Sequence, residues 1–196
     1  MRVLLVVDPI RDDCGFVREV ADAATSGLQR VGHHVDVVDL GARRYSPVMS
    51  AADRRAYFSD DPLICSETAE SAALVKRADS LVFVYPSTLS TVSPGLKGWI
   101  DRTFVPGVAF TLGDRTGSRR GLSNIRHLTG IAVYDESRLD VWRQGDNGRR
   151  LIRRNIRLCG GLRTRSHWIA MYECAGADDL DRTRFLVDVE RRMAHS

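Results

Sequence analysis

The sequence predicts an α/β fold in which helices cover both faces of a five-stranded parallel sheet. Five short runs are rich in apolar residues, at positions 3–8, 33–40, 79–85, 128–134 and 166–172. Runs of this kind are typical of strands that are buried on both faces. Segments with the apolar period of a helix lie between them. This alternation indicates a doubly wound sheet whose strands are joined by crossover helices.

Each expected helix is identified by its apolar stripe and its end signals. The first begins at Phe16, and Gly32 ends it. Further helices are expected over residues 62–78, 94–104, 149–158 and 178–193, with a shorter helical patch at 50–58. A polar loop is expected after residue 134. The inward stripe of the first helix comprises Phe16, Val20, Ala24, Leu28 and Val31.

The order of the strands follows from general rules of chain connection. Parallel strands are joined by right-handed crossovers, which leaves few arrangements and favours the flavodoxin-like order 2-1-3-4-5. The whole chain, residues 1–196, is expected to form one such domain. Ligands in these sheets bind at the carboxyl ends of the strands, next to the switch point between strands 1 and 3. Three loops are therefore candidates for a site, at 8–16, 85–94 and 134–146.

The composition indicates an intracellular globular protein. The chain has 43% hydrophobic and 28% charged residues, and its four cysteines lack the paired spacing of zinc or redox motifs. We interpret them as reduced thiols. No run approaches the roughly 20 apolar residues of a membrane span, and the first residues lack the features of a signal peptide. A cytoplasmic protein that does not bind membranes is expected.

Arginine is concentrated in the second half of a chain whose net charge is +4. The segments are "RTGSRRGLSNIR" and "GRRLIRRNIRLCGGLRTR". Three interpretations remain open: a solvated helix face, an anion site for a phosphorylated ligand, or a nucleic-acid surface. The aromatic residues that a single-strand binder interleaves with its basic residues are absent, so no nucleic-acid partner is expected. Trp142, in the polar loop, is a candidate to cap a substrate cavity.

Most of the chain resembles one family. The segment "LKGWIDRTFVPGVAF" (96–110) carries the resemblance, which continues through "VFVYP", "VDVVDLGARRYSPVMSAADRRAYF", "RRLIRRNIRLCGG" and "HWIAMY". These segments resemble the flavin-dependent NAD(P)H:quinone reductases of flavodoxin-like fold. The resemblance implies a bound FMN or FAD. It also implies hydride transfer from NAD(P)H to the flavin and then to a quinone or similar aromatic acceptor, in a homodimer.

The resemblance also implies which residues hold the flavin, and the sequence departs from the family in all three loops. Asp8 stands where the family has histidine, Leu89 where it has tryptophan, and Tyr134-Asp135-Glu136-Ser137 where it has threonine-threonine-glycine-glycine. The hydroxyl-rich loop after the third strand suits the edge of an isoalloxazine ring. The implied cofactor-binding residues are Asp8, Arg11, Gly15, Phe16, Pro86, Ser87, Thr88, Leu89, Ser90 and Tyr134.

Two further functions compete with the flavin-dependent one. In the first, the chain has lost the flavin and acts as an isomerase, dehydratase or cyclase on a quinone- or polyketide-like substrate, with Tyr134 and Asp135 as its catalytic acid and base. In the second, it is a binding module without catalysis. We expect no metal site, because the adjacent His33 and His34 have no carboxylate partner at metal-ligand spacing. Arg119, Arg120 and Arg126 are either partners of a nicotinamide nucleotide phosphate or solvated surface.

Overall fold

The structure, a computed structural model, describes residues 1–10, 15–59, 61–63, 65–111, 119–161 and 163–195. Its centre is a parallel sheet in the order β2-β1-β3-β6-β7. The two remaining strands, β4 and β5, form a separate antiparallel ribbon, so the predicted order 2-1-3-4-5 is confirmed for the main sheet. The sheet strands are β1 (Arg2–Val7), β2 (His34–Asp39), β3 (Ser80–Pro86), β6 (His127–Val133) and β7 (Arg165–Met171).

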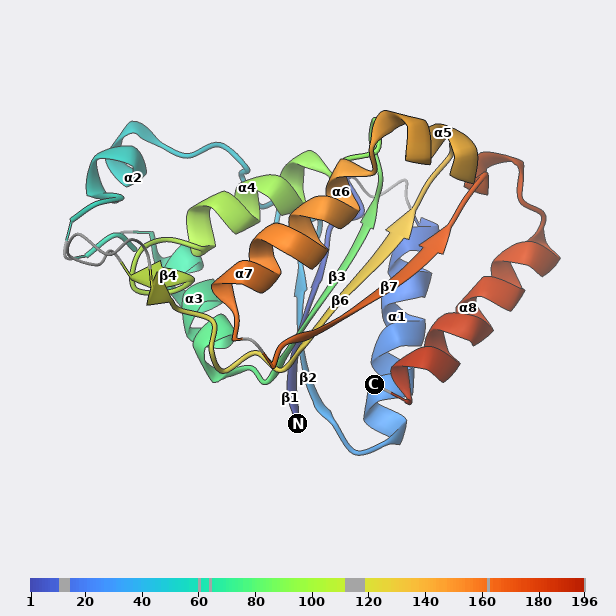
Figure 1. The fold of residues 1–196 in the computed structure, drawn as a ribbon, viewed down its shortest axis with the longest axis horizontal. Helices are drawn as coiled ribbons and strands as arrows, with labels where there is room; N and C mark the ends of the chain where they lie inside the picture. Colours follow the sequence, from blue (N-terminus) through green and yellow to red (C-terminus); the bar gives the residue numbers. More distant parts are fainter. Residues whose placement is uncertain (11–14, 60, 64, 112–118, 162, 196) are drawn as a thin grey trace.

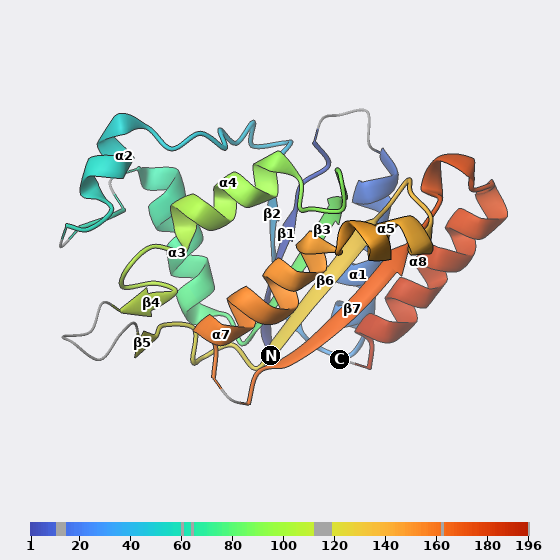
Figure 2. The same ribbon diagram turned by 45° about the horizontal axis from the view of Figure 1, so that its top comes forward.

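The helices form one layer on each face of the sheet (Figure 1). One layer holds α1 (Gly15–Arg30) and α8 (Asp179–Met193). The other holds α3 (Ser66–Arg77), α4 (Pro94–Thr103) and a continuous run made of α6 (Asn147–Arg150), η1 (Leu151–Ile156) and α7 (Arg157–Cys159). Figure 2 shows that α2 (Ala51–Ala56) and the ribbon of β4 (Phe110–Thr111) and β5 (Arg119–Arg120) lie away from the sheet, on the side of α3 and α4.

The strands are apolar because each side of the sheet carries its own core. In β1, Leu4 and Val6 face the core under α3, α4 and η1, whereas Val3, Leu5 and Val7 face the core under α1 and α8. Successive side chains of a strand point to opposite faces. A strand with both faces covered therefore needs a continuous apolar run, which is the pattern that predicted the sheet.

Trp99 of α4 is the largest side chain in the core beneath that helix. It is completely buried, and its indole Nε1 donates a hydrogen bond of 3.1 Å to the hydroxyl of Ser71 in α3. The rings of Phe83 and Phe104 meet it edge to face, with centroids 6.1 and 5.7 Å away. Aromatic pairs prefer this geometry. These contacts fix α4 against both α3 and the sheet.

The elements differ from the expected ones in several places, among them the helix expected over 62–78, which begins only at Ser66. A helix, α5 (Arg138–Gln144), occupies part of the expected polar loop. The expected helix over 149–158 begins two residues earlier and contains the π-helix η1. Val31 follows the last residue of α1 and is 44% exposed, so its placement in the buried stripe was wrong. The helix has ended there, and Gly32, with a φ of +81°, turns the chain back towards β2.

Two classes of feature are absent from the described ranges. None of the helices there combines the length and the apolar character that a membrane span requires. The same residues contain no group of three or more His, Cys, Asp or Glu side chains that could hold a metal ion.

The crossing of α1 and α8 generates a stability prediction. A Cβ atom at Gly27 would overlap the backbone carbonyl of Glu190 in α8, whereas one at Gly15 in the same helix would meet no atom within 4 Å. We expect Gly27→Ala to lower the free energy of unfolding by about 1–3 kcal/mol, because the two helices must separate. Denaturant titration measures it, with Gly15→Ala as the control. Equal stability of the two variants would contradict this packing.

Candidate functional site

The carboxyl ends of the sheet strands meet at the edge where α5 lies (Figure 1). Three connections leave the sheet there: residues 8–14 after β1, 87–93 after β3 and 134–137 after β6. These match the three loops predicted to hold a ligand. Arg11 lies outside the described residues, as does the rest of the segment 11–14.

Asp8 directly follows β1, and the residue is only 3% exposed. One oxygen accepts a hydrogen bond of 3.0 Å from the amide of Ile10, and the other accepts one of 2.8 Å from the amide of Leu96 in the first turn of α4. The usual cap residue, Ser93, makes no side-chain cap bond, so Asp8 performs this function from a different segment of the chain. The amino-terminal dipole of α4 also favours a negative charge there.

Gly95 makes the approach of Asp8 possible. A Cβ atom at this position would overlap the Asp8 carboxylate. The two residues therefore form one unit in which the charge of Asp8 is taken up by backbone amides. This arrangement turns the carboxylate towards α4 rather than into the space beyond the strand.

At the start of α1, Gly15 is exposed and has open space around it. The first turn of the helix carries no acidic residue. Phe16 is half-buried against Phe185 of α8, with ring centroids 6.4 Å apart, and the guanidinium of Arg182 lies 5.5 Å from its ring. Phe16 thus packs onto a neighbouring helix, while the Gly15 end of α1 is accessible.

The loop after β3 forms a tight turn. Pro86 is the last residue of β3 and pairs with Val133 of β6. Thr88 and Thr91 then form a bridge through two backbone hydrogen bonds, of 3.3 and 3.0 Å. Between them Leu89 and Ser90 have φ values of +48° and +54°. Such values are uncommon for residues other than glycine, and for leucine they indicate strain.

The polar groups of this turn divide into two sets. The Ser87 hydroxyl donates to the Thr91 carbonyl over 3.2 Å, and the buried Ser90 hydroxyl donates to Gln144 Oε1 of α5 over 2.8 Å. The amides of Leu89 and Ser90 donate to no group within the described segments. Thr88 is exposed, and the Leu89 side chain is 79% exposed at the tip. The turn therefore offers the Leu89 amide and an apolar surface to a ligand, whereas Ser90 is buried beneath them.

Tyr134 begins the loop after β6, and its side chain is completely buried. Its hydroxyl donates a hydrogen bond of 2.8 Å to Asp146 Oδ1, and its ring stacks on Tyr172 with centroids 5.1 Å apart. Asp135, the predicted partner of Tyr134 in acid/base chemistry, is exposed. The structure thus gives the Tyr134 hydroxyl a different carboxylate, Asp146.

A second buried phenol lies beside this pair. Tyr85 of β3 is completely buried, and its hydroxyl has no hydrogen-bond partner among the described groups. It lies against Gly148 of α6, where a Cβ atom would come within 2.7 Å of it. Burial raises the pKa of both Tyr85 and Tyr134 above the ordinary value, and the charge of Asp146 raises the two pKa values further.

Sequence reasoning missed Asp146, Gln144 and the helix that positions them. Ser137 caps α5 by accepting a hydrogen bond of 3.2 Å from the amide of Asp140, and Gly145 ends the helix with a φ of +93°. Serine followed three residues later by an acid, and glycine after the last turn, are signals of helix ends. They were available in "SRLDVWRQG". No sequence pattern indicated that Gln144 would bond to Ser90, or Asp146 to Tyr134.

Because the Asp8 carboxylate accepts two hydrogen bonds, we predict that removing it destabilises the fold. We expect Asp8→Ala to lower the free energy of unfolding by about 2 kcal/mol, since two amides, one at the buried start of α4, lose their acceptor. Denaturant titration measures this loss. The exposed Asp135, changed to alanine, is the matched control and should remain within about 0.5 kcal/mol of the parent. Comparable losses in both variants would refute the capping role.

The buried phenols predict a pH dependence. In the unfolded chain a tyrosine ionises near pH 10, whereas burial keeps Tyr134 protonated to higher pH in the fold. The unfolded state therefore releases protons first, and stability decreases as pH rises above about 10. We expect a shallower decrease in Tyr134→Phe, measured by denaturant unfolding between pH 8 and 11. A slope equal to that of the parent would show that Tyr134 does not contribute.

Comparison with known proteins agrees with this arrangement. The family profile described as "Flavodoxin-like fold" matches residues 1–147. NAD(P)H dehydrogenase [quinone] 1 of Cavia porcellus is 31% identical over 57% of this chain and 46% of its own length. The FMN-dependent NADH:quinone oxidoreductase of Methylocella silvestris is 31% identical over 65% of this chain and 66% of its own length. The chain thus spans about half to two thirds of these two relatives.

A solved structure extends the likeness in fold to the whole chain. The NAD(P)H:quinone oxidoreductase from Methanothermobacter marburgensis superposes with a TM-score of 0.80 at 23% identity, over 100% of this chain and 96% of that one. Four of the five sheet strands, the capped α4 and the three strand-end loops lie within the region that the family profile matches, and β7 lies beyond it. The chain therefore belongs to the flavodoxin-like fold family, alongside relatives named as NAD(P)H:quinone oxidoreductases.

Proposed function

We propose that this protein is a flavin-dependent oxidoreductase that takes a hydride from NAD(P)H and reduces a quinone or similar aromatic acceptor. The flavin, FMN or FAD, would lie at the carboxyl ends of β1, β3 and β6. The observation that carries the proposal is the turn Thr88–Thr91 at the switch point of the sheet, where the exposed Leu89 keeps an amide that has no partner among the described residues. Strained backbone is often kept where it positions a group for function.

The residues present fit a flavin. The amino-terminal end of α1 at Gly15 is open and free of acids in its first turn, as a phosphate group requires. The Asp8 carboxylate is turned to backbone amides of Ile10 and Leu96, so it does not oppose that phosphate directly. The exposed Leu89 side chain can cover one face of a planar ring by dispersion.

Each loop would have a separate role in the reaction. A bound flavin supplies the hydride transfer itself. The Leu89 amide would donate a hydrogen bond to the polar edge of the ring and orient it, and α1 would hold its phosphate. Tyr134, held by Asp146, would form the floor between the loops after β3 and β6. Its raised pKa keeps this phenol a neutral hydrogen-bond donor at physiological pH.

We also propose that the protein forms a homodimer through the side that carries α2. A groove of about 670 Å³ lies between α2, α4, the β4 strand and η1. Several of its lining residues are apolar, and the Phe58 ring is 63% exposed beside it. Exposed apolar surface of this kind is typical of interfaces. A second copy is the partner that the family resemblance implies.

Flavin binding and turnover test the proposed function. We expect FMN or FAD to remain with the protein after gel filtration and NAD(P)H to reduce it, with a quinone restoring the oxidised absorption bands. Leu89→Ala should weaken flavin affinity several-fold, because the ring loses its apolar cover. The matched control is Val187→Ala, which shortens an exposed side chain of α8. Protein that binds neither flavin would overturn the proposal and favour flavin-free acid/base chemistry.

A further inference from the structure

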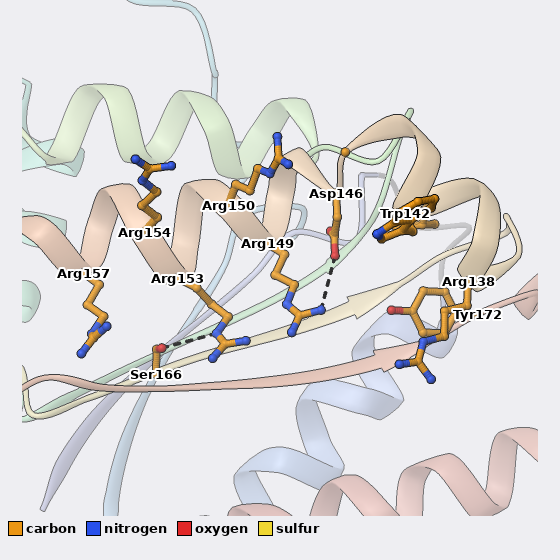
Figure 3. A pocket seen from close by; sticks show the side chains of 12 residues that line it. Arg138, Trp142, Asp146, Arg149, Arg150, Arg153, Arg154, Arg157, Ser166 and Tyr172 are labelled. Carbon is orange, nitrogen blue, oxygen red and sulfur yellow. Dashed lines mark hydrogen bonds and ion pairs between the residues drawn. The ribbon is translucent and has the colours of Figure 1, made fainter.

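A pocket of about 440 Å³ lies outside the loops after β1 and β3 (Figure 3). Its walls come from α5, α6, η1, α7, the edge strand β7 and Tyr172 beyond it. The volume falls within the range of about 300–1,000 Å³ that is typical of small-molecule sites. Its lining includes six arginines: Arg138, Arg149, Arg150, Arg153, Arg154 and Arg157.

The positive charge of this pocket is largely uncompensated. Asp146 is the only acidic residue among the described lining residues, and it accepts the Tyr134 hydroxyl while lying 3.9 Å from Arg149. Arg150 and Arg154 make no ion pair within the described ranges. A concave surface with one sign of charge concentrates the field and attracts oppositely charged ligands. The charge of this pocket therefore favours an anionic ligand.

Three of the arginines form a row that is held in place by the protein. Arg149, Arg153 and Arg157 recur every four residues along one side of the helical run, which spans about 12 Å at 1.5 Å per residue. Arg153 Nε donates to the Ser166 hydroxyl over 3.4 Å, and Arg157 Nε donates to the Thr164 carbonyl over 2.9 Å. Their terminal nitrogens remain available for the bidentate bonds that guanidinium groups make to phosphate.

The helix itself departs from regular geometry beside this row. Residues 151–156 form a π-helix, a rare conformation that is often found at functional sites. Its buried residues Ile152 and Ile156 face the sheet core, while Arg153 lines the pocket. The core anchor thus fixes the direction in which the arginine side chains leave the helix.

The other end of the pocket is aromatic. Trp142 of α5 is 75% exposed, and the Tyr172 ring lies across from it, beside Arg138 (Figure 3). An exposed tryptophan presents a large planar surface that can stack on a ring of a ligand. Aromatic side chains of nucleic-acid-binding proteins hold bases by stacking in this way. One end therefore suits a planar ring and the other suits several anionic groups.

We propose that this pocket binds a nucleoside polyphosphate. The base stacks on Trp142, and the phosphates lie along Arg149, Arg153 and Arg157. A long single strand fits less well, because it needs successive aromatic platforms, and Trp142 is the pocket's one exposed tryptophan. This proposal does not depend on flavin binding, since none of the residues of the Thr88–Thr91 turn lines the pocket.

Titration of the purified full chain with ATP tests the proposal. Calorimetry gives the affinity, and tryptophan fluorescence reports stacking on Trp142. We expect ATP to bind more tightly than AMP, and both affinities to decrease with salt. Trp142→Ala should weaken ATP binding about tenfold and leave the affinity for inorganic tripolyphosphate unchanged. Equal affinities of the parent and Trp142→Ala for ATP would overturn the stacking assignment.

Matched arginine variants test the phosphate end. We expect the double change Arg149→Gln and Arg153→Gln to weaken ATP and tripolyphosphate at least about tenfold, because charge-assisted hydrogen bonds are lost. Arg143→Gln is the control, since this residue of α5 is exposed and does not line the pocket. Melting curves without ligand check folding. If the double variant melts early, Arg157→Gln alone, which removes one exposed arginine of the row, should still weaken ATP several-fold.

Three results would overturn the nucleotide site. They are unchanged ATP affinity in the folded arginine variants, ATP affinity lost in Leu89→Ala, and affinity for oligothymidylates that rises with length beyond that for ATP. The second would place the nucleotide at the strand-end loops, and the third would indicate a nucleic-acid surface. Failure of flavin binding with ATP binding intact would remove the proposed oxidoreductase function and leave this site in place.

Discussion

The carboxylate of Asp8 connects the end of β1 to α4, the helix whose amino terminus borders the strand-end loops. It accepts hydrogen bonds from the amides of Ile10 and Leu96, and Gly95 leaves room for it. The position of α4 then fixes the end of the loop that leaves β3. An acid in this place has a structural explanation, because the amides and the helix dipole stabilise its charge. The departure from the family's histidine is therefore compatible with an anion bound nearby.

The turn after β3 depends on the segment that follows β6. The Ser90 hydroxyl is bonded to Gln144, and the Ser90 carbonyl accepts the Gly148 amide over 3.0 Å. Gly148 in turn has no room for a side chain, since the Tyr85 hydroxyl and the backbone of Thr91 and Val92 lie against it. These contacts hold Leu89 and Ser90 at positive φ. The strain is local, and the surrounding bonds are what sustain it.

Elements that depend on the local apolar pattern could be predicted from the sequence, whereas contacts between distant segments could not. The continuous apolar runs of β1, β3 and β6 require two covered faces, so the sheet and its order could be predicted. The apolar stripe of α4 likewise accounts for the burial of Trp99. The partners of Tyr134 and Ser90 could not be predicted, because both bonds depend on how α5 folds back over the strand ends. The α5 helix has one buried side chain, Val141, and gives almost no apolar signal.

The number and positions of the arginines in the sequence did not distinguish the three interpretations of the arginine-rich segment. A solvated helix face is lined by both signs of charge or open to water all round. The row on η1 and α7 instead faces a pocket, where Asp146 is the one described acid, and two guanidinium groups are bonded to Ser166 and Thr164. Arginines that repel one another in a shared concavity destabilise the isolated protein. Pre-oriented groups whose charges are uncompensated are best explained by a ligand that supplies the missing negative charge.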